Sequence, residues 1–441
     1  MRLLIYTAET TERLSYTFDF ILGDLLGLEY TFTRDKELFL ANAGPKFSYA
    51  AKPLGDELFF ECATLLFETE IYLQPIDFIN YENLVGFYIV SKRSDLPFDM
   101  FASSFSMLSR YNEYLIHKKD KYDRYRAGQS TNFMAGFLNK PMVNYYALKL
   151  KKLLAARFPE LKFKQNKFEY IATFDVDMAY AYRGRGWKTN LRGFGRSLLV
   201  SNFREVINRY RVIFGNKKDP YDTFEYILAT CKRYAVKTKF FFLVGNKSGL
   251  DKNISHTHEG FRHLIQEVAS RSEIGIYLSF MSHISNDVME EEIQRLEFIT
   301  GVKIDSNRFN YLRFTMPASF ISLNRIGITQ DYSMGYATRS GFRAGTCSPF
   351  CFFNLLKNER TNLKLHPFAF MDTTLARYNK LGSRESLEKI LLMMRWVKEV
   401  EGPFIGIWHN NSFIDSGIWR GWGTVFETVA REAAALTDKG E

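Results

Sequence analysis

The sequence has few cysteines and no long apolar run, and each absence excludes a class of protein. Cys62, Cys231, Cys347 and Cys351 are the only four cysteines in 441 residues, and no two form a CxxC pair. A disulfide-rich secreted scaffold is therefore excluded, and free, mostly buried thiols in the cytoplasm fit best. The spacing of Cys347 and Cys351 leaves a metal or disulfide role open for that pair alone. No stretch of about 18 apolar residues occurs, which argues against a membrane-spanning helix.

The N-terminus also lacks the features of a signal peptide. Its short apolar start soon reaches Glu9 and Glu12, and no small-residue cleavage site follows. We therefore expect a cytoplasmic protein, either free or peripheral at the inner membrane face. Hydrophobic residues make up 46% of the chain and charged residues 24%, which is ordinary for a globular protein with a sizeable core. The length of 441 residues indicates two or three domains.

The net charge of +10 is concentrated in one segment. Residues 183–218 contain ten Lys or Arg residues and one Glu, a net charge of +9. Within 198–214, apolar residues recur near helical spacing with arginines between them. Such a basic amphipathic helix fits an anionic membrane surface, a lid that clamps an anionic substrate, or an insertion whose charges are solvated. No recognisable nucleic-acid-binding fold accompanies the charge, so we expect no nucleic acid partner.

The first 160 residues are predicted to form a smaller α/β domain of unknown role. Strand-like runs rich in β-branched and aromatic residues precede two segments of helical spacing, and Pro159 marks the boundary. The predicted strands are 3–6, 30–33, 38–41, 58–62 and 86–90, and the predicted helices are 101–115 and 142–158.

Residues 165–441 show a regular alternation of strands and helices, interrupted by the basic insertion 183–218. Strands that are apolar throughout and alternate with helices indicate a parallel sheet covered on both faces. The number of such units favours a barrel over an open sheet, with functional groups at the C-terminal strand ends. The predicted strands are 169–175, 238–245, 273–277, 309–314, 328–331, 362–366 and 403–408, and the predicted helices are 221–234, 258–271, 287–300, 318–325 and 384–400.

Several polar residues follow these strands. Asp175 and Asp177 come at the end of the first one, and carboxylates two residues apart project to the same side of an extended segment. The two carboxylates could bind one divalent cation together, or one could bind the metal while the other acts as a base. The alternative is that both are turn or cap residues at the strand end. His409 follows the last strand, where a pKa near neutrality suits proton donation. Three more polar residues lie near strand ends: Arg308, Arg313 and Asp331. An arginine there can hold a carboxylate ionised and oriented, or it can form an ordinary structural ion pair.

Four motifs in this order resemble the polysaccharide deacetylase (NodB-like) family. They are Thr-Phe-Asp-Val-Asp177, Ile-Gly-Ile-Tyr277-Leu-Ser-Phe, the segment 307–317 with Arg308 and Arg313, and Ile-Trp-His409. The segments 330–337, 341–345 and 366–372, with 108–115 and 136–141, look like a Bacteroidetes-type subgroup that joins an uncharacterised N-terminal domain to such a barrel. The resemblance spans nearly the whole chain.

The resemblance implies a deformed (β/α) barrel of the polysaccharide deacetylase type preceded by a smaller α/β domain. It also implies removal of an acyl group from an N-acetylated sugar by means of a divalent metal, zinc or similar. Carried over, Asp175 is the base, Asp177 a metal ligand and His409 the acid, with Arg308 or Arg313 orienting the base; Asp175 and Asp177 remain open to exchange. The residues expected to contact the carbohydrate are Tyr277, Asp331, Arg343, Trp408 and Asn410.

One position departs from the family pattern. Where the resemblance leads us to expect a metal-binding His-Pro-Ser-type segment, the chain has Tyr277-Leu278-Ser279. Phenol is a poor zinc ligand at neutral pH because an ordinary pKa near 10 leaves it protonated. His283 or His256 is the candidate to fill the vacancy; otherwise the site holds metal weakly or not at all.

Two functions of different classes follow. The first is a deacetylase-like hydrolase acting in cell-surface glycan metabolism, with a carbohydrate substrate that is free or lipid-linked. The alternative is a catalytically inactive barrel that binds glycan or membrane surface and assists polysaccharide assembly. The position of a histidine relative to Asp177 distinguishes them.

Overall fold

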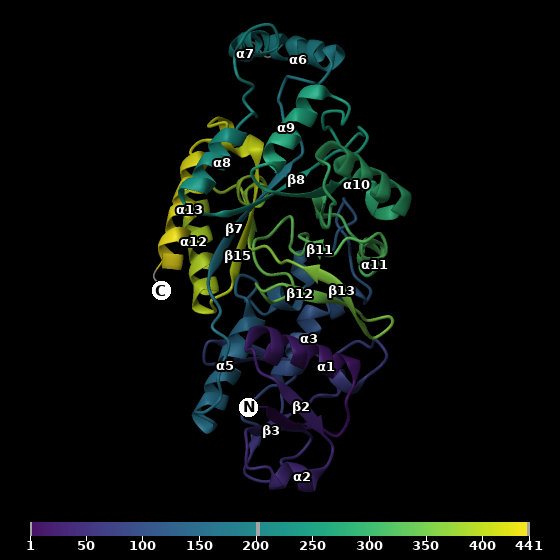
Figure 1. Cartoon of the computed structure of the whole chain (residues 1–441), viewed down its shortest axis with the longest axis vertical. Coiled ribbons are helices and arrows are strands. Elements are labelled where there is room, and N and C mark those ends of the chain that lie inside the picture. The colour runs from purple at the N-terminus through teal and green to yellow at the C-terminus, as the bar shows by residue number, and fades with distance from the viewer. Residues whose placement is uncertain (1, 200–202, 439–441) are drawn as a thin grey trace.

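The first part of the chain forms a small parallel sheet. The computed structural model describes residues 2–199 and 203–438. The strands lie in the order β2, β1, β3, β4, with all neighbours parallel (Figure 1). A hairpin of β5 and β6 follows. Their bounds are β1 Leu3–Tyr6, β2 Tyr30–Thr33, β3 Lys46–Ala50, β4 Leu58–Glu61, β5 Phe78–Tyr81 and β6 Leu84–Phe87.

The helices of this part correct two predictions. The predicted strand 38–41 is wrong, because Asp35 accepts hydrogen bonds from the backbone N–H groups of Glu37 and Leu38 and so caps a helix there. The predicted helix 101–115 ends early, at Leu108, and Arg110 then adopts a left-handed φ of 57°. The helix at 142–158 is confirmed. The helices are α1 Glu12–Phe18, a π-helical turn Asp19–Leu25, α2 Lys36–Ala41, α3 Met100–Leu108, α4 Thr131–Met134 and α5 Met142–Arg157.

The rest of the chain is built on a nine-stranded sheet. Its order is β12-β13-β11-β10-β9-β8-β7-β15-β14. Every neighbouring pair is parallel except β12 and β13, which are antiparallel. The strands are β7 Glu169–Val176, β8 Lys237–Phe242, β9 Glu273–Leu278, β10 Ser306–Phe309, β11 Gln330–Asp331, β12 Phe350–Asn354, β13 Glu359–Leu365, β14 Phe370–Met371 and β15 Pro403–His409.

This sheet is open, which corrects the expectation of a barrel. Within the described residues the edge strands β12 and β14 do not pair with each other. The antiparallel β12 ends the parallel pairing at one edge, and β14 has only two residues at the other. The predicted alternation of parallel strands with helices is confirmed. The predicted strand 309–314 is displaced: β10 ends at Phe309, and a turn with left-handed φ at Tyr311 and Leu312 follows.

The two faces of the sheet have different environments. On β8, Phe240 and Phe242 belong to the main hydrophobic core, whereas Phe241 points to the other face. There it joins a smaller buried cluster that includes Tyr277 and Ile407. Successive side chains along a strand point to opposite faces of the sheet, so residues of this inner face alternate in sequence with residues of the helix-covered face. The functional residues described below lie on the inner face.

The helices of this part agree closely with prediction, with one addition. The five predicted helices correspond to α8 to α12, and α13 near the C-terminus was not predicted. His258 caps α9 through Nδ1, which accepts from the Phe261 backbone N–H. The bounds are α8 Phe224–Arg233, α9 Glu259–Ala269, α10 Asn286–Thr300, α11 Ala318–Arg325, α12 Ser383–Glu399 and α13 Trp422–Asp438.

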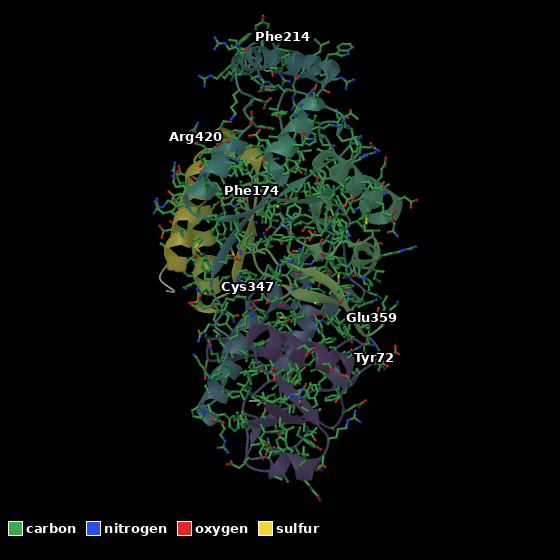
Figure 2. The ribbon with its side chains drawn as sticks, in the orientation of Figure 1. Tyr72, Phe174, Phe214, Cys347, Glu359 and Arg420 are labelled. Carbon is green, nitrogen blue, oxygen red and sulfur yellow. The ribbon has the colours of Figure 1, made fainter. Side chains whose placement is uncertain are left out.

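The two sheets share one continuous hydrophobic core (Figure 2). A buried charge cluster also joins the two parts, because Glu113 accepts hydrogen bonds from both Arg110 and Arg343. Arg343 is 3% exposed and its guanidinium is paired with this carboxylate, so it holds the two parts together; its expected contact with substrate stays a prediction. The division into domains 1–160 and 165–441 stays a prediction.

A pair of helices projects from the end of the molecule opposite the small sheet (Figure 1). They are α6 Trp187–Leu199 and α7 Phe203–Ile213, and they contact each other. The predicted helix 198–214 thus covers α7 and the end of α6, while its residues 200–202 lie outside the described part. No helix in the described residues is both long and apolar enough to span a bilayer.

Candidate functional site

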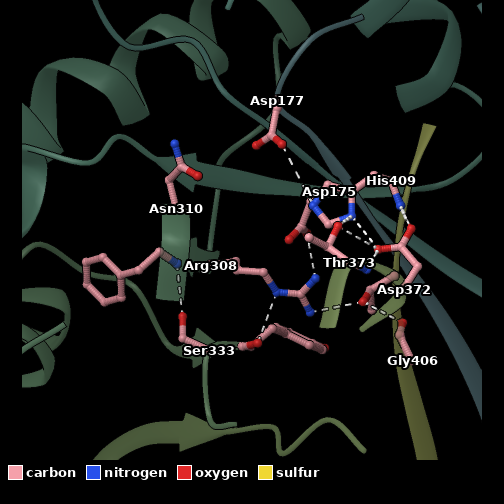
Figure 3. A network of polar contacts seen from close by, with 12 residues as sticks. Asp175, Asp177, Arg308, Asn310, Ser333, Asp372, Thr373, Gly406 and His409 are labelled. Carbon is pink, nitrogen blue, oxygen red and sulfur yellow. Dashed lines mark hydrogen bonds and ion pairs between the residues drawn. The ribbon is translucent and has the colours of Figure 1, made fainter. Parts of the chain in front are cut away.

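Sheet register brings the predicted acids and the histidine together. β7 and β15 are parallel neighbours, and Asp175 is the direct partner of His409. Asp177 follows two residues later and lies 3.8 Å from His409, measured from Oδ2 to Nε2 (Figure 3). The structure therefore places Asp175, Asp177 and His409 at one end of the sheet, as the strand-end argument expects.

Arg308 is the arginine that holds Asp175. Its Nη1 lies 2.6 Å from Asp175 Oδ1, and both side chains are almost fully buried (Figure 3). The guanidinium also donates to Thr173 Oγ1 and to the Tyr332 carbonyl, and it lies over the Phe241 ring at 4.5 Å. This cage satisfies the buried cation on several sides, so Arg308 and Asp175 are fixed relative to each other.

Arg313 does not reach this pair. Its Nη1 donates to the Phe280 carbonyl at 3.1 Å, and its other terminal nitrogen lies 3.9 Å from Asp123. The guanidinium stacks over the Phe280 ring at 4.1 Å. Of the two arginines offered by the sequence, the structure therefore favours Arg308 and leaves Arg313, whose side chain is half-buried, beside Phe280 and Asp123.

His409 is paired with a buried carboxylate that was not among the predicted site residues. Asp372 Oδ1 lies 2.7 Å from His409 Nδ1, and Asp372 Oδ2 accepts from the His409 backbone N–H at 2.7 Å. Ser412 also donates to Oδ2, and Thr373 to Oδ1. Burial lowers the pKa of His409, but Asp372 and the more distant Asp177 and Asp175 outweigh it and raise the pKa to about 9. At neutral pH the imidazole is therefore protonated, with Nε2–H directed toward Asp177.

Asp177 is the carboxylate of the site that reaches solvent, with 39% of its side chain exposed. Desolvation, which His409 opposes and Asp175, Asp372 and Asp251 reinforce, raises the pKa of Asp177 to about 6. Because part of the side chain is wet, solvent screening weakens these effects. Asp177 and His409 thus form an acid–base pair that a ligand can approach.

These two residues line a cavity of about 480 Å³. Five tyrosines surround it, and three cationic side chains lie at its wall. Arg124 is paired with Asp120, whereas Lys252 and Arg377 have no ion pair in the described chain. The tyrosines are Tyr122, Tyr221, Tyr277, Tyr311 and Tyr378, the cations are Arg124, Lys252 and Arg377, and further polar groups come from Asn310, Thr373 and Asn411.

The residues present do not fit the expected metal. His283 Nδ1 lies 3.1 Å from the Phe280 carbonyl, His256 is held beside α9 through its carbonyl, and neither lines the cavity. Among the described residues no three His, Cys, Asp or Glu side chains come together as a possible ligand group. Burial, with Asp175 and Asp177, raises the pKa of Tyr277 well above its ordinary value, so the phenol stays protonated. Asp177 therefore lacks partner ligands, and the prediction of a compensating histidine finds no support.

Three more residues predicted to contact substrate are buried and have structural partners, and their contact with substrate stays a prediction. Asp331 is fully buried and accepts from Asn307 and from the backbone and hydroxyl of Ser333. Trp408 is fully buried on the helix-covered face, where Nε1 donates to the Tyr170 hydroxyl. Asn410 is 1% exposed and donates to three backbone carbonyls, which fixes the loop after β7. Tyr277 alone of this predicted group lines the cavity.

Sequence reasoning missed Asp372 and the cationic wall. Asp372 ends the motif 366–372 directly after β14, so its place at a strand end was the available signal. Arg377 follows in the turn after β14, and Lys252 lies in the loop after β8. Arg124 comes from the first part of the chain, which offered no such signal. The cavity is thus completed by a segment distant in sequence.

Comparison with known proteins gives weak similarities. A family described as "Family of unknown function (DUF7033)" matches residues 3–159. No curated protein matches the sequence. The solved structures that align with the chain include CE4 polysaccharide deacetylases, at low sequence identity and partial coverage. A protein assigned as a polysaccharide deacetylase from Mycobacterium smegmatis aligns at 14% identity and TM-score 0.42, over 62% of this chain and 86% of that one.

Two further structures align less closely. The polysaccharide deacetylase from Bacillus cereus gives 13% identity and TM-score 0.30, over 63% of this chain and 89% of that one. A mutant of a CE4 family pseudoenzyme, with restored enzymatic activity, gives 9% identity and TM-score 0.31, over 61% and 65%. All three TM-scores are below 0.5, so the function of this chain has to be argued from its own site.

Proposed function

We propose that this protein binds a carbohydrate in the strand-end cavity without a metal ion. The observation that supports this most is the lining of the cavity: five tyrosines, several amide and hydroxyl groups, and an Asp177–His409 pair on its floor. Aromatic faces with polar edges, together with a few convergent donors and acceptors, suit a ligand with apolar ring faces and many hydroxyls. The motif resemblance to sugar deacetylases favours the same class of ligand.

The charge of the cavity indicates which carbohydrates fit best. Lys252, Arg377 and protonated His409 face one exposed carboxylate, Asp177, so cations prevail in the cavity. A sugar with a carboxylate or phosphate group would gain charge-assisted hydrogen bonds there. A lipid-linked or nucleotide-linked sugar carries such a phosphate, so the proposed ligand is an anionic glycan precursor.

Binding should be indifferent to metal removal and sensitive to the cavity tyrosines. Tyr378 lines the cavity with 39% of its surface exposed, and we expect Tyr378→Ala to weaken binding about 2- to 10-fold, the effect of losing one aromatic contact. Calorimetry with an N-acetylglucosamine tetramer, and with the same tetramer carrying a terminal phosphate, measures this with and without chelator.

The control is Tyr226→Ala, because Tyr226 has 38% exposure but lies on α8 away from the cavity. The proposal is contradicted if chelator abolishes binding, or if both tyrosine variants bind as the unaltered protein does. Tighter binding of the phosphorylated tetramer supports the anionic ligand.

A second candidate function is metal-independent hydrolysis of an N-acyl group. The buried Asp372–His409 pair favours it, because a positioned cationic histidine next to a carboxylate is what amide hydrolysis requires. Asp177 would take a proton from water as its oxygen bonds to the acyl carbon, and His409 Nε2 would protonate the nitrogen as the C–N bond breaks. The products are a carboxylic acid and a free amine, and the protonated Tyr277 phenol, which lines the same cavity, would donate to the developing oxyanion.

Acetate release from the same tetramers distinguishes the two candidates. Under hydrolysis we expect turnover that persists with chelator and falls about 10²- to 10⁴-fold in His409→Gln. The control is His366→Gln, since His366 is half-buried, does not line the cavity and stacks on Tyr332. Ligand binding with no acetate release would contradict hydrolysis and support binding as the function. Acetate release that requires added metal would contradict both candidates.

A further inference from the structure

The projecting helices α6 and α7 form a defined unit. Ser197, Arg209 and Val212 are buried between them and the loop beneath. The Arg209 guanidinium lies 4.4 Å from the Tyr182 ring and 5.7 Å from the Phe194 ring, and it is paired with Glu205 at 3.0 Å. The two helices are therefore held together by buried contacts of their own, and the hairpin is a folded unit.

Large apolar side chains cover its outer surface. On α6, Trp187, Leu191 and Leu198 follow one another at i, i+4 and i+11, so they lie on one helical stripe. Phe203, Ile207, Tyr210 and Phe214 repeat the pattern i, i+4, i+7 and i+11 along α7 and the residue after it. Figure 2 places Phe214 at the outer end of the molecule. The exposed fractions are 71% for Trp187, 62% for Leu191, 51% for Leu198, 61% for Phe203, 51% for Ile207, 60% for Tyr210 and 70% for Phe214.

Unpaired arginines accompany the apolar stripes. Arg192, Arg196, Arg204 and Arg211 are exposed, and none has an ion pair elsewhere in the described chain. Glu205 is the single acid of the segment 183–218, and it contacts Arg209. A helix whose apolar face were meant for this protein's own core would not leave seven large apolar side chains in water.

We propose that the α6–α7 hairpin docks on an anionic lipid bilayer. Aromatic and aliphatic side chains insert at the boundary of headgroups and acyl chains, and arginines bind anionic headgroups. Charge complementarity carries the choice of occupant, because the segment holds +9 and the lipid surface is negative. A nucleic acid would use the arginines but leave the apolar stripes without a role, and that difference decides the test.

Co-sedimentation of the full chain with vesicles measures the docking. We expect binding to vesicles of phosphatidylcholine with 30% phosphatidylserine and little binding to phosphatidylcholine alone. Replacing Arg192, Arg196, Arg204 and Arg211 by glutamine should reduce partitioning about 100-fold or more, since each contributes about 1 kcal/mol near such a surface. A matched control replaces four exposed arginines outside the hairpin, Arg233, Arg325, Arg384 and Arg431, and should bind normally.

A second variant tests the apolar stripes, and a fluorescence signal locates the contact. Leu191→Ser/Leu198→Ser/Ile207→Ser should also lose binding. Trp187 is exposed, whereas Trp408, Trp419 and Trp422 are buried and Trp396 is half-buried on α12, so we expect most of an emission blue shift on vesicles to come from Trp187. Trp187→Phe should remove most of that shift while the protein still sediments.

Three results would overturn the proposal. They are equal binding to neutral vesicles, unchanged binding of the serine variant despite loss in the glutamine variant, and no binding to either vesicle. The second result would indicate a polyanion site of the nucleic acid type. Sugar binding in the strand-end cavity is measured separately on the same variants and should be unaffected, so failure of one proposal does not decide the other.

Discussion

Replacing Arg308 by methionine should lower the free energy of unfolding by about 3–5 kcal/mol, among the largest effects expected of a single substitution in this protein. The guanidinium and the Asp175 carboxylate are 0% and 1% exposed and lie 2.6 Å apart. Methionine fills part of the volume but leaves a buried carboxylate without its counter-charge, and the hydrogen bonds to Thr173 and Tyr332 are lost as well. Denaturant unfolding monitored by circular dichroism measures the change.

Arg313→Met is the matched control, because Arg313 is partly exposed and its carboxylate contact to Asp123 is 3.9 Å long. It should cost less than about 1 kcal/mol, as exposed ion pairs generally do. The double variant Asp175→Asn/Arg308→Met should recover part of the loss, since the uncompensated charge is gone. Equal costs for Arg308→Met and Arg313→Met would show that the buried pair does not stabilise the sheet.

The sheet was the most predictable part of the chain, and the reason is local. A strand such as β8 is apolar on both faces because residues on each side are buried, and this continuous pattern survives in the sequence. The prediction of a strand at 38–41 was wrong because the apolar run Leu38-Phe39-Leu40 looks the same in a strand and in a short helix. Asp35 caps the segment, and the cap favours the helix. The prediction of a closed barrel was wrong because closure depends on whether the two edge strands pair. The sequences of β12 and β14 do not indicate that these strands lie at the edges.

The site was predictable as far as strand ends were recognised. Asp175, Asp177 and His409 sit in sequences that plainly end apolar strands, and parallel order then places them together. Arg308 and Arg313 could not be separated in the same way, because β10 ends at Phe309 instead of running on to 314. The strand ends five residues earlier than predicted, and the three-dimensional structure is needed to show which arginine points inward.

Both the sequence and the structure bear on whether this site can bind a metal ion. Tyr277 occupies the position where the resemblance expects histidine, and in the part of the chain that the structure describes no three His, Cys, Asp or Glu side chains come together as a possible ligand group. The same cavity wall carries Asn310, whose amide donates to Asp251 at 2.8 Å and so is already engaged. The described part of the chain thus holds an acid–base pair at this site but no such ligand group, which favours sugar binding and metal-free proton transfer.

His409 should make the stability of the protein depend on pH in the alkaline range. Its pKa is about 9 in the folded protein, against about 6.5 in the unfolded chain, so the folded state holds the proton more tightly. This contribution is fully present below pH 6.5 and is lost as the pH rises through 9. Between pH 7 and pH 9.5 the unaltered protein should therefore lose about 2–3 kcal/mol of unfolding free energy from this group.

Asp372→Asn should remove most of that decline and lower overall stability at pH 7. Asparagine takes away the charge that raises the pKa of His409, while burial, which lowers it, remains; the titration midpoint should fall from about 9 toward its ordinary value or below. Urea unfolding from pH 7 to pH 9.5 measures the slope, and histidine ring signals in NMR measure the midpoint. His366 is the internal reference, because its pKa is lowered to about 3 by burial, helped by Lys239 and Lys364, and its signal should not move over this range. An unchanged slope in Asp372→Asn would mean that the Asp372–His409 pair does not control the proton at the floor of the cavity.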